Sequence, residues 1–154
     1  MSKRSQWFFG TLVAAGLVAV PLLDSFGDID RNAVDFKAPA DIKFVRNAAG
    51  TNKQAVLFGD PAKPGPYVVQ LRWFPGNMSR PHFHPNDRFF VVLSGTWWLG
   101  TGTQFDPDST VPVKAGTFVY HKGGEAHYDG AKDEEALIQV WGIGPVTSTA
   151  AEVR

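Results

Sequence analysis

The stretch that decides the fold runs from residue 76 to residue 95 and reads GNMSRPHFHPNDRFFVVLSG. His82 and His84 stand two residues apart, between a glycine turn and a run of strand-forming residues. In an extended chain the side chains at positions i and i+2 point to the same side. We therefore expect both imidazoles to be directed at one point, as a metal site requires.

The other two histidines lie in a second glycine-rich segment, which covers residues 115–127 and reads AGTFVYHKGGEAH. His121 and His127 stand on either side of its Gly-Gly turn. All four histidines of the chain thus fall in two short segments. This clustering favours a shared metal site over four ordinary polar loop residues.

The first segment resembles motif 1 of the cupin superfamily, which is written G-x5-H-x-H-x3,4-E-x6-G. Gly76, His82, His84 and Gly95 occur at the spacings of that motif. Arg88 occupies the place where the motif has a glutamate.

The second segment resembles the looser cupin motif 2, written G-x5-P-x-G-x2-H-x3-N. Gly116, Gly123 and His127 can be laid onto it with one extra residue, and His121 stands where proline is usual. Together the two segments make the chain similar to cupins over roughly residues 40–146.

This resemblance implies an all-β fold, an antiparallel double-stranded β-helix of the cupin or jelly-roll type, often dimeric, with the metal or substrate inside. It also implies that His82, His84 and His127 are the metal ligands. Three neutral imidazoles bind a divalent transition metal such as Fe, Mn, Zn, Ni or Cu, and ligand type alone does not choose among these.

Arg88 is the departure from the pattern, because the usual glutamate at this place is the fourth protein ligand of cupins. Arginine has no lone pair to offer a metal. If Arg88 points inward, its guanidinium can bind the carboxylate or phosphate of a substrate. The alternative is an ion pair with a nearby acid such as Asp87 or Glu125.

Two further residues of the second segment are candidates for catalysis. His121 is an added ligand, a general base or a residue at the rim of the site, and Tyr120 is a second group that can move protons. Many aromatic residues surround these positions in the sequence, and most of them are expected in the core. Trp97 and Trp98 are adjacent and must face opposite sides of a strand, so one of them is a candidate contact in a homodimer.

Composition excludes several classes of function. Lys plus Arg and Asp plus Glu number 15 each, so the net charge is zero, and the basic residues are scattered. A nucleic-acid interface needs a clustered basic face, so we expect no nucleic-acid partner. The chain has no cysteine, which excludes disulfides, thiolate metal ligands and a cysteine nucleophile.

The N-terminal segment has the layout of an export signal. Lys3 and Arg4 precede the apolar residues 7–23, which carry no charge. We interpret residues 1–27 as a hydrophobic helix that serves as a signal peptide or a membrane anchor, with cleavage before Asp28. The protein is then exported, either periplasmic or secreted, and contacts a membrane only through this segment if it is uncleaved.

The remaining chain divides into a linker or arm at 28–39, the barrel at 40–146 and a polar tail at 147–154. Strands are expected at 42–46, 54–58, 67–74, 88–93, 96–99, 111–113, 117–121 and 136–143. Residues 88–99 are expected to form a hairpin that turns at Gly95. Residues 129–135 are expected to form a charged loop.

Two functions fit this sequence. The first is an exported metal-binding cupin that acts as a small-molecule metalloenzyme of the dioxygenase, isomerase or lyase type. The second is a non-catalytic, extracytoplasmic cupin that binds a small anion or sugar, with or without a metal. The fold alone does not choose between them.

Overall fold

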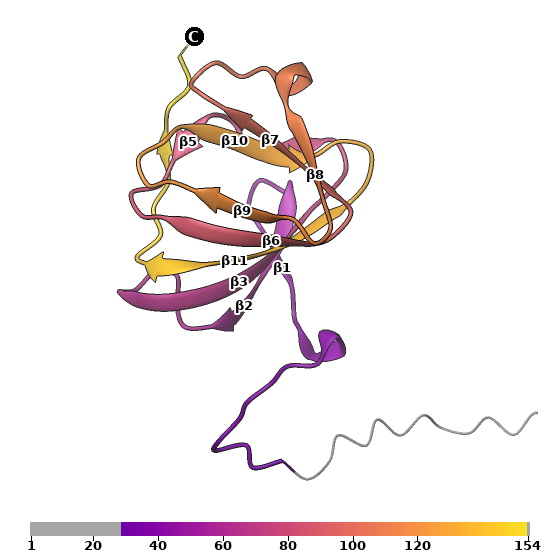
Figure 1. The fold of residues 1–154 in the computed structure, drawn as a ribbon, viewed down its shortest axis with the longest axis vertical. Coiled ribbons are helices and arrows are strands. Elements are labelled where there is room, and N and C mark those ends of the chain that lie inside the picture. Colours follow the sequence, from indigo (N-terminus) through magenta and orange to yellow (C-terminus); the bar gives the residue numbers. More distant parts are fainter. Residues whose placement is uncertain (1–28, 154) are drawn as a thin grey trace, which may run out of the picture. The chain divides into compact units, whose positions relative to one another are not determined.

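The computed structural model describes residues 29–153 (Figure 1). Its contacts divide the chain into two units, with the boundary between Asp35 and Phe36. In the first unit a short turn places the backbone N–H groups of Ala33 and Val34 on the carbonyl of Asp30. The predicted hydrophobic helix at residues 1–27 lies outside the described residues.

The second unit is built almost entirely of strands. Their bounds are β1 (Val45–Arg46), β2 (Asn52–Phe58), β3 (Gly65–Trp73), β4 (Asn77–Met78), β5 (His82–Phe83), β6 (Arg88–Ser94), β7 (Thr96–Thr101), β8 (Val111–Lys114), β9 (Phe118–His121), β10 (His127–Ala131), β11 (Ala136–Gly144) and β12 (Thr149–Ala150). Two 3₁₀ turns, η1 (Pro39–Asp41) and η2 (Pro107–Ser109), complete the described elements.

The strands form two antiparallel sheets. Sheet A has the order β1-β2-β3-β11-β6-β9, and sheet B has the order β12-β5-β10-β7-β8 with β4 also paired to β10. Every strand pairing among residues 29–153 is antiparallel. The predicted all-β, double-stranded β-helix is therefore confirmed for this part of the chain.

The core lies between the two sheets because their strands alternate inward apolar with outward residues. On β11, Ala136, Ile138 and Val140 are buried and alternate with more exposed neighbours. On β7, Trp97 is fully buried, whereas Trp98 faces outward and lies under the ammonium group of Lys132. The predicted division of the two tryptophans between opposite faces is confirmed.

The predicted hairpin at residues 88–99 is wrong. β6 pairs with β11 and β9 in sheet A, whereas β7 pairs with β10 and β8 in sheet B. Gly95, with φ of 73°, passes the chain from one sheet to the other, and a Cβ there would collide with the carbonyl of Glu135. The chain changes sheet here because Phe90, Val92 and Trp97 all bury their side chains in the same core.

Two other segments are more ordered than expected. Residues 127–131 form the buried strand β10, although residues 129–135 were predicted to be a charged loop. The tail predicted for residues 147–154 contains β12, which extends sheet B. Within residues 29–153 no helix is long and apolar enough to cross a membrane.

Candidate metal centre

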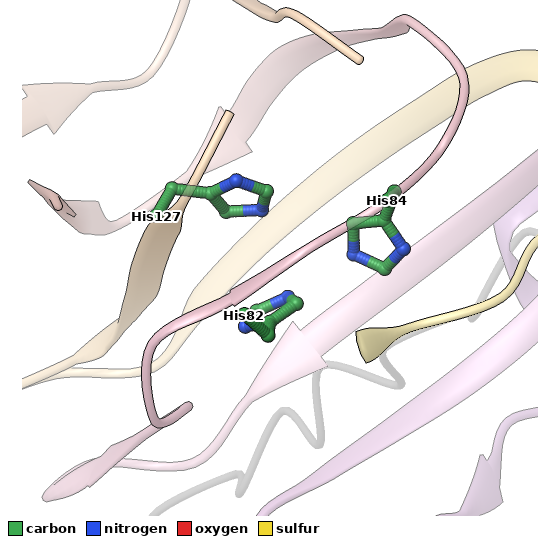
Figure 2. Close-up of side chains that lie close together, drawn as sticks. All are labelled: His82, His84 and His127. Carbon is green, nitrogen blue, oxygen red and sulfur yellow. The ribbon is translucent and has the colours of Figure 1, made fainter. Parts of the chain in front are cut away.

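Three histidines of sheet B meet at one place. His82 lies on β5 and is directly paired with His127 on β10. His84 follows β5 at the i+2 position, so its side chain lies on the same side as that of His82. Figure 2 shows the three rings around one shared space. Their ring centroids are 4.9 Å apart for His82–His84, 4.6 Å for His82–His127 and 5.5 Å for His84–His127.

One ligand nitrogen from each of these three side chains lies within 4.8 Å of the others. The convergence expected from the sequence is therefore present in the structure. Pairing across the strands brings His127 to the other two, even though it is more than forty residues away in the chain. Three imidazoles on one face of a sheet are a donor set that suits Zn, Fe, Ni, Cu or Mn.

A backbone carbonyl fixes the orientation of each ring. The Nδ1 of His82 lies 2.8 Å from the carbonyl oxygen of Arg80. The Nδ1 of His84 lies 2.6 Å from the carbonyl oxygen of Thr147, and the Nδ1 of His127 lies 3.0 Å from the carbonyl oxygen of Glu125. Because a carbonyl only accepts hydrogen bonds, each Nδ1 carries the proton and donates. Each Nε2 is then unprotonated and carries a lone pair, which is the arrangement that metal-binding histidines need, although at His127 this lone pair accepts a hydrogen bond from Arg88.

Burial keeps His84 and His127 neutral. It is the main cause that lowers the pKa of His84 to about 3, with a further contribution from the charge of Arg88. Burial also lowers the pKa of His127 from its ordinary value. The Nε2 of His84 is buried and has no hydrogen-bond partner among residues 29–153. A buried, neutral and unpartnered imidazole nitrogen fits a metal ion as its ligand.

Arg88 extends from β6 in sheet A toward the same place. Its Nη2 donates to the Nε2 of His127 at 3.3 Å, and its guanidinium carbon lies 5.1 Å from the ring centre of Phe90. Burial lowers the pKa of Arg88, and the carboxylate of Asp129 acts in the opposite direction. Its Nε is buried without a hydrogen-bond partner in the described chain.

The alternative of an ion pair between Arg88 and an acid of the neighbouring loops is not observed. Among residues 29–153 no salt bridge includes Arg88. Asp87 instead accepts hydrogen bonds from the hydroxyl of Tyr120 and the backbone N–H of Gly123. Glu125 contributes its carbonyl, rather than its carboxylate, to the support of His127.

His121 and Tyr120 lie on opposite faces of β9. The ring of His121 faces the core. Its centroid lies 4.2 Å from the ring centroid of His127 and 4.6 Å from the ring centroid of Phe90. Burial is the main cause that lowers the pKa of His121 to about 2, followed by the charge of His127. Its Nδ1 is buried with no hydrogen-bond partner in the described part of the chain.

Tyr120 points away from the histidines. Its side chain is 44% exposed and stacks on Phe89 with a centroid separation of 5.3 Å. Its hydroxyl donates to Asp87 at 2.8 Å. The structure therefore brings His121 to the cluster and leaves Tyr120 outside it.

The sequence reasoning missed Asp129. This carboxylate is 6% exposed, accepts a hydrogen bond of 3.1 Å from the indole N–H of Trp97, and forms a second possible metal group with His121 and His127. The signal was available, because Asp129 stands two residues after His127 and so shares its face of the strand. It was hidden by the prediction that a loop begins at this residue.

Two cavities reach the cluster. One, of about 740 Å³, is lined by His82, His84 and Arg88 together with apolar side chains such as Trp73 and Ile138. The other, of about 860 Å³, is lined by residues that include His121, His127, Lys122 and Glu125. Both have the size of a small-molecule site.

Several solved structures are similar to this chain in fold. The polyketide cyclase RemF from Streptomyces resistomycificus aligns with a TM-score of 0.64 at 19% identity, over 79% of this chain and 87% of that chain. The DMSP lyase DddQ from Ruegeria pomeroyi aligns with a TM-score of 0.57 at 15% identity, over 75% of this chain and 64% of that chain.

An RmlC-like cupin from Shewanella frigidimarina aligns with a TM-score of 0.55 at 12% identity, over 70% of this chain and 88% of that chain. The class of protein defined by the two sheets is thus an antiparallel double-stranded β-helix. The chain has the fold of the cupin superfamily. No protein-family model and no curated protein matches its sequence.

Proposed function

We propose that this protein is a metal-dependent cupin enzyme that acts on a small anionic or oxygen-chelating molecule. The observation that carries the proposal is the set of three hydrogen bonds from Nδ1 atoms to backbone carbonyls. These bonds put the ring protons of His82, His84 and His127 on Nδ1 and leave Nε2 as the ligand atom of each ring, and at His127 a metal would take the place of the Arg88 donor. A bound divalent metal would supply Lewis-acid or oxygen chemistry there.

The substrate would enter the cavity of about 740 Å³ beside His82 and His84. Apolar walls such as Trp73 and Ile138 favour an apolar or aromatic body. Arg88 lies in the same cavity with an unpartnered Nε, so it is placed to bind a carboxylate, phosphate or enolate oxygen. Similar solved structures are described as a polyketide cyclase, a DMSP lyase and a sugar phosphate isomerase, which makes an enzyme a reasonable proposal for the fold.

We assign proton transfer to His121 rather than to Tyr120. His121 lies beside His127 and its Nδ1 has no hydrogen-bond partner among residues 29–153. An anionic substrate near this ring would favour the protonated imidazolium. The pKa of His121 would then rise toward the range in which acid–base catalysis is efficient.

A second candidate function is a metal-free cupin that binds a small anion or sugar without turnover. One observation favours it: Arg88 donates to the Nε2 of His127 and so uses a lone pair that a metal would need. In this function Arg88 and the histidine N–H groups would hold the ligand. Metal content separates the two functions directly.

The test is elemental analysis of the full-length protein beside a His82→Ala/His84→Ala double variant. Near-stoichiometric Fe, Mn, Ni, Cu or Zn that is lost in the double variant supports the metalloenzyme. A Tyr120→Phe variant is the matched control, because this side chain belongs to the same barrel but faces outward. No metal in any of the three proteins, even after metal is added, would leave the anion-binding function.

We further propose that the protein is a homodimer that associates through the outer face of sheet A. Tyr120, Phe89 and Trp141 occupy directly paired positions on three neighbouring strands and form a stacked row. Phe118 extends this row and is 60% exposed. A contiguous apolar surface of this kind is typical of an interface. Light scattering of a Phe118→Lys variant should show a monomer where the parent chain shows a dimer.

We also propose that the protein is exported. Residues 1–27 have the layout of a signal peptide, with the basic residues Lys3 and Arg4 followed by an uncharged apolar stretch. Sequencing the N-terminus of the mature protein tests it. A mature chain that begins at Asp28 supports a cleaved signal, and a chain that retains residues 1–27 in the membrane fraction supports an anchor. An intact chain in the cytoplasm contradicts both.

A further inference from the structure

The C-terminal segment, residues 145–153, returns from sheet A to sheet B after β11 ends. Its strand β12 pairs antiparallel with β5, with Ala150 opposite His82 and Thr149 opposite Phe83 (Figure 1). The backbone N–H of Ala151 donates to the carbonyl of Pro81 at 2.9 Å. The segment therefore covers the edge of β5 that β10 leaves free.

The strand that it covers carries His82 and leads directly into His84, and this strand is short. β5 has only two residues, and its pairing with β10 consists of the single pair His82–His127. A strand with so little pairing of its own depends on a second neighbour for a fixed position. The C-terminal segment is that neighbour.

The same segment holds the ring of His84 directly and contacts the residue that holds the ring of His82. The carbonyl of Thr147 accepts the hydrogen bond from the Nδ1 of His84 at 2.6 Å. The carbonyl of Arg80 accepts the corresponding bond from His82. Glu152 holds Arg80 in place through a two-point ion pair, in which the Arg80 Nε donates to Oε2 at 2.9 Å and Nη2 contacts Oε1.

The guanidinium of Arg80 is held from a second side as well. Its central carbon lies 3.9 Å from the ring centre of Phe105, so the side chain is fixed by the carboxylate and by an aromatic face. Ser148 and Ala150 of the C-terminal segment line the cavity of about 740 Å³. The segment thus borders the space beside the histidines in addition to supporting them.

The segment contributes little to the core. Residues 147–150 are exposed, and only Val146, at its start, packs against the buried cluster. The burial of apolar surface that stabilises the barrel is located in β3, β6, β7, β10 and β11. Displacement of residues 147–153 should therefore disturb the histidines far more than the fold.

We propose that the C-terminal segment is a strap that positions His82 and His84, and that the Glu152–Arg80 ion pair locks it. Glu152 is then a positioning residue of the metal centre, and release of the strap lowers metal affinity while the barrel stays folded. This inference rests on the proposed metal-binding function. Groups that orient metal ligands from behind typically change metal affinity by about 10- to 100-fold.

The test compares metal affinity with stability in full-length Glu152→Gln protein. We expect the affinity for Co²⁺ and Zn²⁺, measured by chelator competition, to fall about tenfold, and the visible spectrum of the Co²⁺-loaded protein to change. The melting temperature of the metal-free protein should stay within about 2 °C of the parent, because Glu152 forms a surface ion pair. The charge-swapped variant Arg80→Glu/Glu152→Arg should recover most of the affinity.

The matched control is Asp60→Asn, which removes the surface ion pair between Asp60 and Lys63 away from the histidines. A second variant that ends at Val146 removes the Thr147 carbonyl and β12 together and should lose more affinity than Glu152→Gln. If the parent binds metal and both variants bind it equally well, the strap is refuted and the metal site stands. If the parent binds no metal, the strap falls together with the proposed function.

Discussion

The two sheets contribute to the candidate site in different ways. Sheet B supplies His82, His84 and His127, and each of these rings is anchored through Nδ1 to a backbone carbonyl. Sheet A supplies Arg88 and His121, whose side chains donate to no backbone carbonyl among residues 29–153 and, like the Nε2 of His84, keep a buried nitrogen without a hydrogen-bond partner there. Anchored rings are suited to holding an ion, whereas unpartnered buried donors are suited to a ligand that arrives later. In the proposed function, metal binding therefore belongs to sheet B and substrate handling to sheet A.

The largest expected effect separates the histidines of the two sheets. His84→Ala should lower metal affinity by more than about 100-fold, since it removes a ligand and not merely a supporting group. His121→Phe, which keeps the packing against Phe90 and His127, should change the affinity by less than about threefold. Chelator competition on both variants measures this. An equal loss in His121→Phe would make His121 a ligand and erase the distinction between the sheets.

The next effect concerns the cation that sheet A places beside the site. Arg88→Glu should raise metal affinity by at least about tenfold, because it removes a positive charge near His127 and adds a carboxylate ligand. Arg88→Gln removes the charge without adding a carboxylate and should give a smaller gain. The same variants should weaken binding of an anionic substrate, which calorimetry with the metal-loaded protein can detect. Weaker metal binding in Arg88→Glu would show that Arg88 supports the histidines.

When no metal is present, one histidine from each sheet, His84 and His121, should contribute to the pH dependence of stability in the same way. The pKa values of His84 and His121 are lowered to about 3 and about 2 in the folded protein, from an ordinary value of 6.5. Between these limits the unfolded chain binds protons that the folded chain does not, so stability is full above pH 6.5 and falls as the pH decreases below it. The loss approaches about 1.4 kcal/mol per pH unit for each group.

Urea unfolding between pH 7 and pH 5 in the presence of a chelator measures this slope. His121→Phe should have a shallower slope than the parent, because one of the two neutral imidazoles is gone. An unchanged slope in that variant would mean that His121 titrates normally in the folded protein.

The smallest effect is expected on the outer face of the barrel. Tyr120→Phe removes one exposed hydrogen bond to Asp87 and should change metal affinity and turnover by less than about twofold. A large loss of turnover with unchanged metal binding would return Tyr120 to the catalytic residues. Such a result would also place part of the chemistry on the outer face of sheet A.

Much of the sheet B contribution could be predicted from the sequence. The i, i+2 spacing of His82 and His84 predicts a common side in any extended chain. The inclusion of His127 followed from motif spacing, whereas its direct pairing with His82 depends on a strand register that local sequence does not encode. β10 itself was missed because its polar residues suggested a loop. Asp129 of this strand can be buried because its carboxylate accepts a hydrogen bond from the indole N–H of Trp97.

The sheet A contribution was less predictable. The sequence left open whether the Arg88 side chain points into the barrel or outward. An arginine can form a surface ion pair or extend into a buried site, and the sequence does not show which acid lies nearby. The strand predicted at 117–121 already implied that Tyr120 and His121 face opposite sides, as β9 shows, but the sequence did not indicate which of the two sides faces the core. The sequence did not predict the C-terminal strand. β12 consists of two exposed residues, and its conformation depends on its pairing with β5.

The long pairing between β3 and β11 has a consequence for how the protein folds. It runs through nine residue pairs, from Trp73–Ala136 to Gly65–Gly144. All four histidines lie in the chain between these two strands, so the pairing closes a loop that contains the whole candidate site. Folding dominated by such distant contacts is slow, on the order of milliseconds to seconds. The histidines should therefore come together late in folding, and metal added during refolding should leave the rate of the main phase nearly unchanged.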